Sequence, residues 1–296
     1  MNEPTPILRF APSPNGALHL GHAYSALVNQ HMAQALGGHW LLRFEDIDTA
    51  RCTLRFEADM IEDLRWLGLE WQGEPRRQSQ HLDTYREALD SLKSMGLVYP
   101  AFLSRSEIKA IVSHQPDWPR DPDGQPHYPG DERSWSDKRI SAALEEERRH
   151  AWRLNMQAAL ERVDGPLTWR ETGYDGEADT AIIEADPSRW GDVILARSDT
   201  PTSYHLSVVI DDAIQGITHV VRGEDLYEAT AIHRLLQQLL DLPEPLYHHH
   251  RLIRDEQGRK LSKSSHDTSL QALRASGYGA AHIRAKLDLG PYQKSL

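Results

Sequence analysis

Cysteine is nearly absent from this sequence, and so are long hydrophobic runs. Cys52 is the only cysteine among 296 residues, so no disulfide can form within the chain, and we expect a reducing, cytoplasmic location. No segment approaches the roughly 18 consecutive apolar residues of a membrane-spanning helix. Residues 1–6 lack the basic and apolar regions of a signal peptide. We therefore expect no membrane partner.

Positive charge is also scarce. The 33 Lys and Arg are outnumbered by 44 Asp and Glu, which gives a net charge of −11. A nucleic-acid-binding protein needs a local basic surface rather than a basic composition. Candidate patches occur at Arg76-Arg77, Arg148-Arg149 and residues 251–263, although each pattern is also typical of a solvated face. Composition therefore neither supports nor excludes RNA as a partner. Nothing in the sequence indicates the oligomeric state, and a monomer is the expectation.

A phosphate site is predicted near the start of the chain. The apolar residues 7–11 indicate a buried strand, two prolines and Gly16 a tight loop, and residues 23–35 a helix. Between them stands His19-Leu-Gly-His22, whose histidines are three residues apart and can face one ligand. Gly21 would allow a backbone or ring to approach closely. The alternative is an ordinary helix start with one capping and one buried histidine.

A second motif, Lys260-Leu-Ser-Lys-Ser264, follows a glycine-containing, charged segment. Lys260 and Lys263, interleaved with serines, suit a loop that closes on a triphosphate, although a solvated basic loop would look the same. The two motifs together are far more specific than either alone.

Both motifs resemble the signatures of class I aminoacyl-tRNA synthetases. The surrounding residues resemble the glutamyl branch of that family, in family order: residues 9–22, 43–51, 202–212 and 216–225. The resemblance implies an α/β fold with a doubly wound parallel, Rossmann-type sheet split by an α/β insertion, followed by a short helical tail. The implied divisions are residues 1–95 (first half of the catalytic domain), 96–190 (insertion), 191–240 (second half) and 241–296 (KLSKS loop and tail), with no anticodon-binding domain.

The resemblance also assigns roles to individual residues. It implies catalysis by His19, His22, Lys260 and Lys263, and ATP binding, with Mg²⁺, by His19, Gly21, His22 and Lys263. It implies that glutamate is held by Arg9, Ala11, Ser13, Glu45, Tyr204 and Arg222. The chemistry is consistent, because a guanidinium can clamp a carboxylate and Glu45 can hold an ammonium group. The alternatives are a salt bridge from Arg222 to Glu224 or Asp225, and an acidic loop that contains Glu45.

Hydrophobic patterning predicts the remaining elements. Asp48 or Thr49 would cap the helix at 51–67. His248-His-His250 is interpreted as a polar strand end rather than a metal site, because adjacent strand residues point to opposite faces. We expect strands at 40–44, 191–197, 204–210 and 217–221, and helices at 51–67, 80–95, 136–160 and 228–240.

No zinc site is expected in the insertion, although relatives often carry one there. Where the family pattern has cysteines, this sequence has Ala101, Leu103 and Glu132, and only Tyr128 is kept. A structural zinc site needs about four N or S ligands. The insertion would instead be held by its own core, with Trp118, Trp135 and Trp152 as candidate members.

The segment after Ser264 has only 32 residues, which is too short for an anticodon-reading module. The chain thus resembles the truncated members of the glutamyl branch, which attach glutamate to queuosine in the anticodon of tRNA(Asp). L-glutamate and queuosine-containing tRNA(Asp) are the implied partners. Two alternatives remain: a minimal glutamyl-tRNA synthetase that charges tRNA(Glu), and a non-catalytic glutamate or adenylate sensor.

Overall fold

The computed structural model describes residues 5–172, 180–254 and 268–287. The predicted KLSKS residues, Lys260 and Lys263 among them, lie outside these ranges. Within them, no helix combines the length and the apolar character needed to cross a membrane.

The first half of the catalytic fold is a parallel three-stranded sheet with its helices. The sheet has the order β1-β2-β3, and Ile7 is in register with His39. Its elements confirm the predicted strands and helices to within a few residues. They are β1 (Ile7–Phe10), α1 (Leu20–Ala35), β2 (His39–Phe44), α2 (Leu54–Trp66), β3 (Arg76–Arg77), η1 (Gln78–Gln80) and α3 (Leu82–Ser94).

The second half continues the sheet from the free edge of β1. Thr218, just before β9, exchanges backbone and side-chain hydrogen bonds with Ile7 at 2.8 to 3.2 Å. The strand order β3-β2-β1 is thereby extended by β9-β10-β6-β7, in which β9, β10 and β6 are parallel and β7 is antiparallel. The elements are β6 (Thr168–Thr172), β7 (Thr180–Glu184), α7 (Tyr204–Ile214), β9 (His219–Gly223), η5 (Glu224–Leu226), α8 (Thr230–Leu239) and β10 (Leu246–His250).

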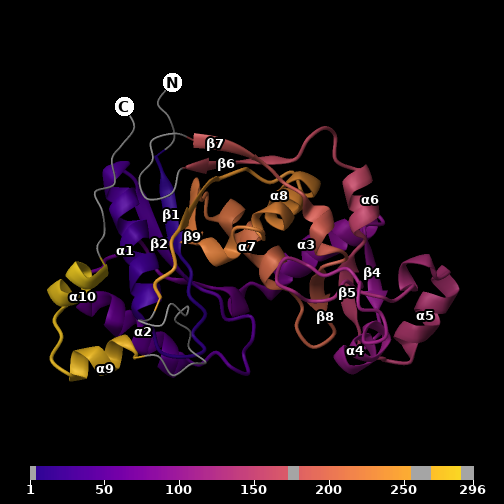
Figure 1. Ribbon diagram of the computed structural model, residues 1–296, viewed down its shortest axis with the longest axis horizontal. Helices are drawn as coiled ribbons and strands as arrows, with labels where there is room; N and C mark the ends of the chain where they lie inside the picture. The colour runs from indigo at the N-terminus through magenta and orange to yellow at the C-terminus, as the bar shows by residue number, and fades with distance from the viewer. Residues whose placement is uncertain (1–4, 173–179, 255–267, 288–296) are drawn as a thin grey trace.

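This arrangement confirms the predicted doubly wound, Rossmann-type fold. The strand order reverses between β1 and β9, because the first half adds strands outward from β1 and the second half adds them on the other side; such sheets bind ligands at this point, at the carboxyl ends of the strands. Helix α1 packs its apolar face (Tyr24, Leu27) against Leu8, Phe10 and Val221 in one core cluster. Helices α7 and α8 lie on the central sheet beside the insertion (Figure 1) and contribute to a second cluster. The tail helices α9 (Leu270–Ala275) and α10 (Ala280–Leu287) lie near α1 and α2 (Figure 1).

The insertion forms a lobe around an antiparallel sheet of order β4-β5-β8. Its apolar residues share one core cluster with α7 and α8, so the prediction that the insertion is held by a core of its own is wrong. The strand pairing differs from the predicted boundary at residue 190, because β8 belongs to the insertion sheet while β6 and β7 belong to the catalytic sheet. The division of the chain into four parts, at residues 1–95, 96–190, 191–240 and 241–296, remains a prediction. The lobe contains β4 (Val98–Ala101), α4 (Arg105–Val112), η2 (Glu132–Ser134), α5 (Asp137–Glu145), β5 (Ala151–Leu154), α6 (Met156–Glu161), η4 (Pro187–Trp190) and β8 (Ile194–Arg197).

The predicted strand at 204–210 is wrong, because these residues begin helix α7. The hydroxyl of Ser203 accepts a hydrogen bond from the backbone N–H of Leu206 and caps the helix. The helix is buried on nearly all sides from Leu206 to Asp212. A short apolar run of this kind lacks the polar face that would reveal a helical period.

The predicted helices at 136–160 and 51–67 also need correction. Strand β5 interrupts the first, and Ser136 and Asn155 cap the separate helices α5 and α6. The second begins only at Leu54, where the Thr53 side chain accepts from the backbone of Phe56, so neither Asp48 nor Thr49 caps it. Local caps thus divide charged stretches that composition alone makes uniformly helical.

Where the resemblance implies a zinc site in relatives, hydrogen bonds join the chain segments around residues 102, 128 and 132. The Glu132 carboxylate, 3% exposed, accepts from the backbone N–H of Phe102 and from the Tyr128 hydroxyl. That hydroxyl in turn accepts from the backbone N–H of Leu103. Of the three candidate tryptophans, Trp135 stacks on Phe102 and Trp152 packs against the larger core cluster. The prediction of no zinc itself stays a prediction.

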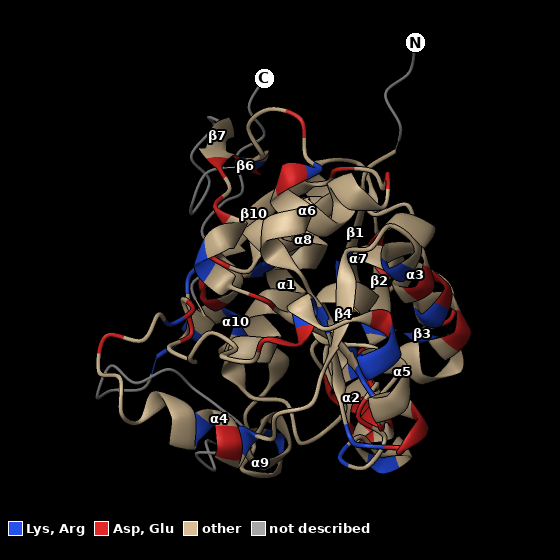
Figure 2. Ribbon diagram, turned by 90° about the vertical axis from the view of Figure 1, so that its right-hand side faces the viewer, with Lys and Arg blue, Asp and Glu red and all other residues tan. Residues whose placement is uncertain are grey.

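Two of the three candidate basic patches contact other residues of the protein, and the third, 251–263, lies mostly outside the described residues. Arg76 pairs with Asp211 and Arg77 with Glu57, so this pair ties β3 to α7 and α2. Arg149 pairs with Asp199, and Arg148 lies over the Phe102 ring. Figure 2 shows acidic and basic residues side by side along α3 and α4, the arrangement of a solvated face.

Candidate active site

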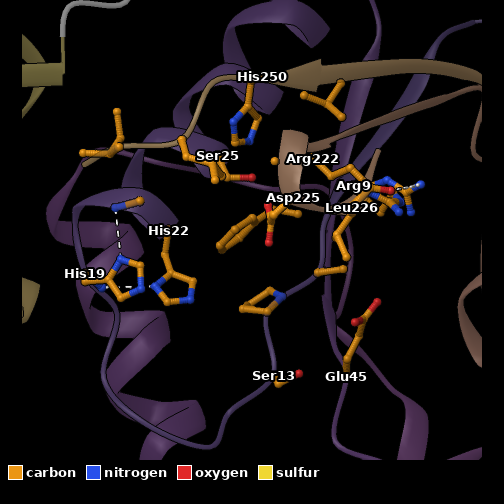
Figure 3. A pocket seen from close by; sticks show the side chains of 18 of the residues that line it. Arg9, Ser13, His19, His22, Ser25, Glu45, Arg222, Asp225, Leu226 and His250 are labelled. Carbon is orange, nitrogen blue, oxygen red and sulfur yellow. Dashed lines mark hydrogen bonds between the residues drawn. The ribbon is translucent and has the colours of Figure 1, made fainter. Parts of the chain in front are cut away.

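A cavity of about 790 Å³ opens at the carboxyl ends of β1, β9 and β10 (Figure 3). Its walls come from the loop after β1, the start of α1, and the residues that follow β9 and β10. The volume lies within the range typical of cofactor sites. The lining contains every described residue predicted for the site: Arg9, Ala11, Ser13, His19, Gly21, His22, Glu45, Tyr204 and Arg222.

The two histidines of the first motif cap helix α1. His19 Nδ1 accepts from the backbone N–H of Gly21 at 3.1 Å, and His22 Nδ1 accepts from the backbone N–H of His19 at 3.2 Å. The alternative of one capping and one buried histidine is therefore met only in part, because both histidines accept hydrogen bonds at the helix start and both line the cavity (Figure 3). Because each Nδ1 is an acceptor, the neutral rings carry their hydrogen on Nε2. Each therefore has an N–H donor of the kind that binds phosphate oxygens.

Gly21 lies close to the ring of His19. A Cβ built at position 21 would lie 3.0 Å from Cε1 and 3.1 Å from Nδ1 of that ring. A side chain there would press on the imidazole and shift it by a few tenths of an ångström. This explains the glycine structurally, and its contact with ATP stays a prediction.

Opposite the histidines, Arg9 is held by a buried charge network. Its Nε donates to Asp212 Oδ1 at 2.9 Å, and Arg43 Nη1 donates to the same oxygen at 2.7 Å. Burial alone would raise the pKa of Asp212, but the two guanidinium groups outweigh it and keep that pKa below its ordinary value. Asp212 therefore remains ionised and fixes Arg9 at the cavity wall.

Asp211 extends this network into the core of the catalytic domain. It is 0% exposed and accepts from Arg76 at 2.8 Å and from Gln78 and Tyr85 at 2.9 Å. From the sequence, Asp211 and Asp212 were expected at the end of a strand and had no predicted role. Their partners lie more than a hundred residues away in the chain, so no local pattern could reveal them.

Glu45 stands at the carboxyl end of β2, where the predicted ammonium site would be. Arg43 Nη2 donates to its Oε1 at 3.2 Å. Burial raises the pKa of Glu45 although Arg43 and Arg9 oppose the shift. The neighbouring acidic residues are structural, as expected: Asp46 accepts from Ser79, and Asp48 pairs with Arg51.

Arg222, on β9, is 5% exposed and is surrounded by neutral groups. Its nitrogens donate to His233, His249, Thr230, the carbonyl of Leu226 and the hydroxyl of Tyr204. Within residues 5–172, 180–254 and 268–287 it forms no ion pair, so the salt bridge to Glu224 or Asp225 that the sequence allowed is not formed. A buried cation without a carboxylate partner is costly unless a ligand supplies one.

Most of the histidines around this site were not predicted from the sequence. His205 Nδ1 lies 3.2 Å from His233 Nε2, and His249 Nδ1 lies 2.8 Å from Glu171 Oε2. The run 248–250 is at a strand end as predicted, but these histidines are 2 to 6% exposed rather than solvated. Burial lowers the pKa of His205, His249 and His250 to about 4 in each case.

Acid should therefore destabilise the protein well above pH 4. Between about 6.5 and 4 the unfolded state binds protons at these three histidines and the folded state does not, so unfolding is favoured as pH falls. Each histidine contributes a loss of about 3 kcal/mol across that window. Asp63, whose pKa burial raises to about 6, and Glu45, whose pKa burial also raises, act in the opposite direction, whereas the lowered pKa of buried His233 adds to the effect of the three histidines.

Urea unfolding measured from pH 8 to pH 4.5 checks this expectation. The unfolding free energy should be nearly constant above pH 7 and fall steeply below pH 6. His250→Gln should reduce the slope by one proton, and substitution of the exposed His114 should leave it unchanged. A flat profile down to pH 5 would contradict the assignment of neutral buried histidines.

A smaller cavity of about 290 Å³ adjoins the first. The two share Ser13, Glu45 and Tyr204, and the small one is closed by residues at and after β8 (Arg197, Thr200). The insertion lobe thus contributes directly to the surroundings of the predicted glutamate residues. No cluster of three or more metal-ligating side chains occurs in the part of the chain that the structure describes.

Known proteins with similar sequences agree with this architecture. The model of the catalytic domain of class I tRNA synthetases (E and Q) matches residues 7–290. A glutamyl-Q tRNA(Asp) synthetase of Rhodobacter capsulatus is 48% identical over 290 residues, covering 96% of this chain and 100% of that protein. A glutamate–tRNA ligase of Prochlorococcus marinus is 37% identical over 92% of this chain, which spans only 56% of that protein.

A solved structure agrees at the level of the fold and sequence. A crystal structure of a glutamate tRNA ligase from Elizabethkingia meningosepticum, in complex with its amino acid, has a TM-score of 0.71 and 26% identity. The match covers 93% of this chain and 54% of that one. The chain therefore belongs to the class I tRNA synthetases for glutamate and glutamine, and its relatives of matching length are glutamyl-Q tRNA(Asp) synthetases.

Proposed function

We propose that this protein activates L-glutamate with ATP and transfers it to queuosine in tRNA(Asp). The observation that carries the proposal is Arg222, a buried guanidinium that faces the large cavity without a carboxylate partner among the described residues. A substrate with an anionic side chain would compensate this charge. Glutamine, the neutral isostere, would not.

The remaining pocket residues complete a glutamate site. Arg9 offers a second guanidinium held in place by Asp212, and Glu45 offers a carboxylate for the substrate ammonium group. Tyr204 stands beside Arg222 and can donate its hydroxyl hydrogen to the same substrate carboxylate. Ala11 and Ser13 form the adjoining wall.

The opposite side of the cavity suits the nucleotide. His19 and His22 would direct Nε2–H donors toward phosphate oxygens, and Gly21 lies between them at the start of α1. Lys260 and Lys263 of the second motif would neutralise the triphosphate, together with Mg²⁺ bound to ATP. These assignments rest on the family's motifs and on the placement of the described residues.

The reaction needs positioning and charge stabilisation rather than a protein nucleophile. An oxygen of the glutamate α-carboxylate attacks the α-phosphorus of ATP in line with the leaving pyrophosphate, and the P–O bond to pyrophosphate breaks. The resulting glutamyl-adenylate is then attacked at its carbonyl carbon by a hydroxyl of the acceptor nucleoside. That hydroxyl loses its proton and AMP leaves.

The choice of acceptor follows from the relatives that match along their whole length. The proteins named glutamyl-Q tRNA(Asp) synthetase are covered over 100% and 84% of their lengths, whereas the glutamate–tRNA ligases are covered over little more than half. Queuosine-containing tRNA(Asp) is therefore the proposed acceptor, and tRNA(Glu) is the competing one.

Transfer of radiolabelled glutamate tests the proposal. With ATP present, we expect label on tRNA(Asp) that contains queuosine, and none on queuosine-free tRNA(Asp) or on tRNA(Glu). Label on tRNA(Glu) would instead identify a minimal translation enzyme. Absence of both transfer and glutamate-dependent pyrophosphate exchange would favour a binding protein.

The variant Lys263→Ala separates enzyme from sensor in the same assay. Loss of the lysine should abolish pyrophosphate exchange, because the charge that develops on the triphosphate loses its counterion. Glutamate binding measured by calorimetry should remain. If the wild-type protein binds glutamate but shows no pyrophosphate exchange, the protein is a sensor rather than an enzyme.

A further inference from the structure

All five N–H donors of Arg222 are directed to neutral acceptors. Nε donates to His249 Nε2 at 3.1 Å, and Nη1 donates to His233 Nδ1 at 2.9 Å. Nη2 donates to Thr230 Oγ1 at 2.7 Å and to the Leu226 carbonyl at 3.2 Å. The fifth and longest bond, 3.4 Å, runs from Nη1 to the Tyr204 hydroxyl at the cavity wall. The guanidinium is thus rigidly held without being neutralised.

His249 separates Arg222 from a nearby carboxylate. Its Nε2 accepts from Arg222, so its hydrogen is on Nδ1, which donates to Glu171 Oε2 at 2.8 Å. Hydrogen bonds from His249 hold the pKa of Glu171 below its ordinary value although burial opposes this shift, so Glu171 is ionised. The imidazole keeps that negative charge one ring away from the guanidinium.

His233, on helix α8, is a second neutral hydrogen-bond acceptor for Arg222. Its Nδ1 accepts from Arg222, which leaves the hydrogen on Nε2, directed at His205 Nδ1 at 3.2 Å. His233 and His249 are 1% and 2% exposed. Burial lowers the pKa of both, which keeps the two rings uncharged at neutral pH. A protonated ring would have no lone pair for Arg222 and would repel it.

We propose that His233 and His249 are positioning residues that hold Arg222 as neutral hydrogen-bond acceptors and so reserve its positive charge for the side-chain carboxylate of the bound amino acid. The inference rests on the proposed use of glutamate. A carboxylate at either position would hold Arg222 equally well but would neutralise it. The two imidazoles thus orient Arg222 without compensating its positive charge. That charge then discriminates glutamate from glutamine.

Pairs of variants distinguish the effect of losing the hydrogen-bond acceptor from the effect of losing the bulk of each ring. His233→Leu and His249→Leu remove the acceptor, whereas His233→Asn and His249→Gln keep a neutral acceptor oxygen near the same place. In ATP–pyrophosphate exchange we expect each Leu variant to raise KM for glutamate about 10- to 100-fold, the usual cost of a lost hydrogen bond to a charged group. The amide variants should recover most of this loss, and KM for ATP should change little in all four.

A charge-changing variant tests the second half of the proposal. His233→Asp places a carboxylate against Arg222 and should raise KM for glutamate at least as much as His233→Leu does. It should also lower the ratio of glutamate to glutamine activation by about tenfold or more, which His233→Asn should not do. Retained ATP KM in the same assay shows that the variant is folded.

Two results would overturn the positioning role alone. One is an unchanged glutamate KM in both Leu variants; the other is an equal rise in the KM values for glutamate and ATP, which would indicate general loss of structure. Wild-type protein that exchanges pyrophosphate with ATP but not in response to glutamate would overturn the proposed function itself. The two failures are thereby distinguishable.

Discussion

Replacing Arg222 with glutamine should reduce kcat/KM for glutamate at least about 30-fold. Truncating one member of a buried charge pair costs about 2 to 5 kcal/mol, and the contacts of Arg222 among the described residues are all neutral, so its charge is available to the substrate. Pyrophosphate exchange at saturating ATP measures the effect. Because Arg222 is assigned to the side-chain carboxylate, which does not react, the loss should appear mainly in KM for glutamate.

Arg86→Gln is the matched control. Arg86 lies on α3 in an exposed pair with Asp83, outside the cavity lining, and its loss should alter kcat/KM by less than a factor of about two. An Arg222→Gln protein with normal glutamate KM and normal discrimination against glutamine would refute the assignment of Arg222 to the substrate carboxylate.

Asp212→Ala should lower the free energy of unfolding by about 3 to 5 kcal/mol. The substitution leaves Arg9 and Arg43, 4% and 0% exposed, without the carboxylate oxygens that they share. Removing one partner of a buried ion pair is strongly destabilising because the other charge remains desolvated. Urea unfolding at pH 7.5, followed by circular dichroism, measures the change.

Asp83→Ala provides the contrast for this prediction. The Asp83–Arg86 pair joins the same residue types on an exposed helix face, and such pairs are worth about 1 kcal/mol or less. Equal effects of the two substitutions would show that the Asp212 network contributes no more than a surface pair. Because Asp212 holds Arg9, we expect its variant also to lose glutamate activation in whatever fraction remains folded.

Local sequence patterns predicted the first strand–loop–helix unit, and the resemblance to class I synthetases predicted the rest of the fold and the site residues. Strand, loop and helix around His19 and His22 follow each other within thirty residues, so their arrangement is encoded locally. The residues assigned to glutamate by resemblance, from Arg9 to Arg222, all line one cavity in the structure. The class I resemblance is confirmed by the family match over residues 7–290.

What could not be predicted depends on contacts across the chain. Residues 204–210 form the first part of helix α7 rather than the predicted strand, because they are mostly apolar and buried and show no clear helical period. The partners of Asp211 come from β3 and α3, and the histidines around Arg222 come from α8 and β10. These neighbours come from other helices and strands, and no local period or motif connects them.

The strand order has a consequence for how the chain can be divided. Strands β6 and β7 lie between two segments of the insertion lobe in sequence but pair with β10 in the catalytic sheet. A deletion or graft cut at residues 95 and 190 would therefore remove two strands from that sheet and expose the hydrogen-bonding edge of β10, which favours aggregation. An exchange of the lobe between relatives that keeps both sheets intact must leave residues 168–184 with the recipient and carry β8 with the donor.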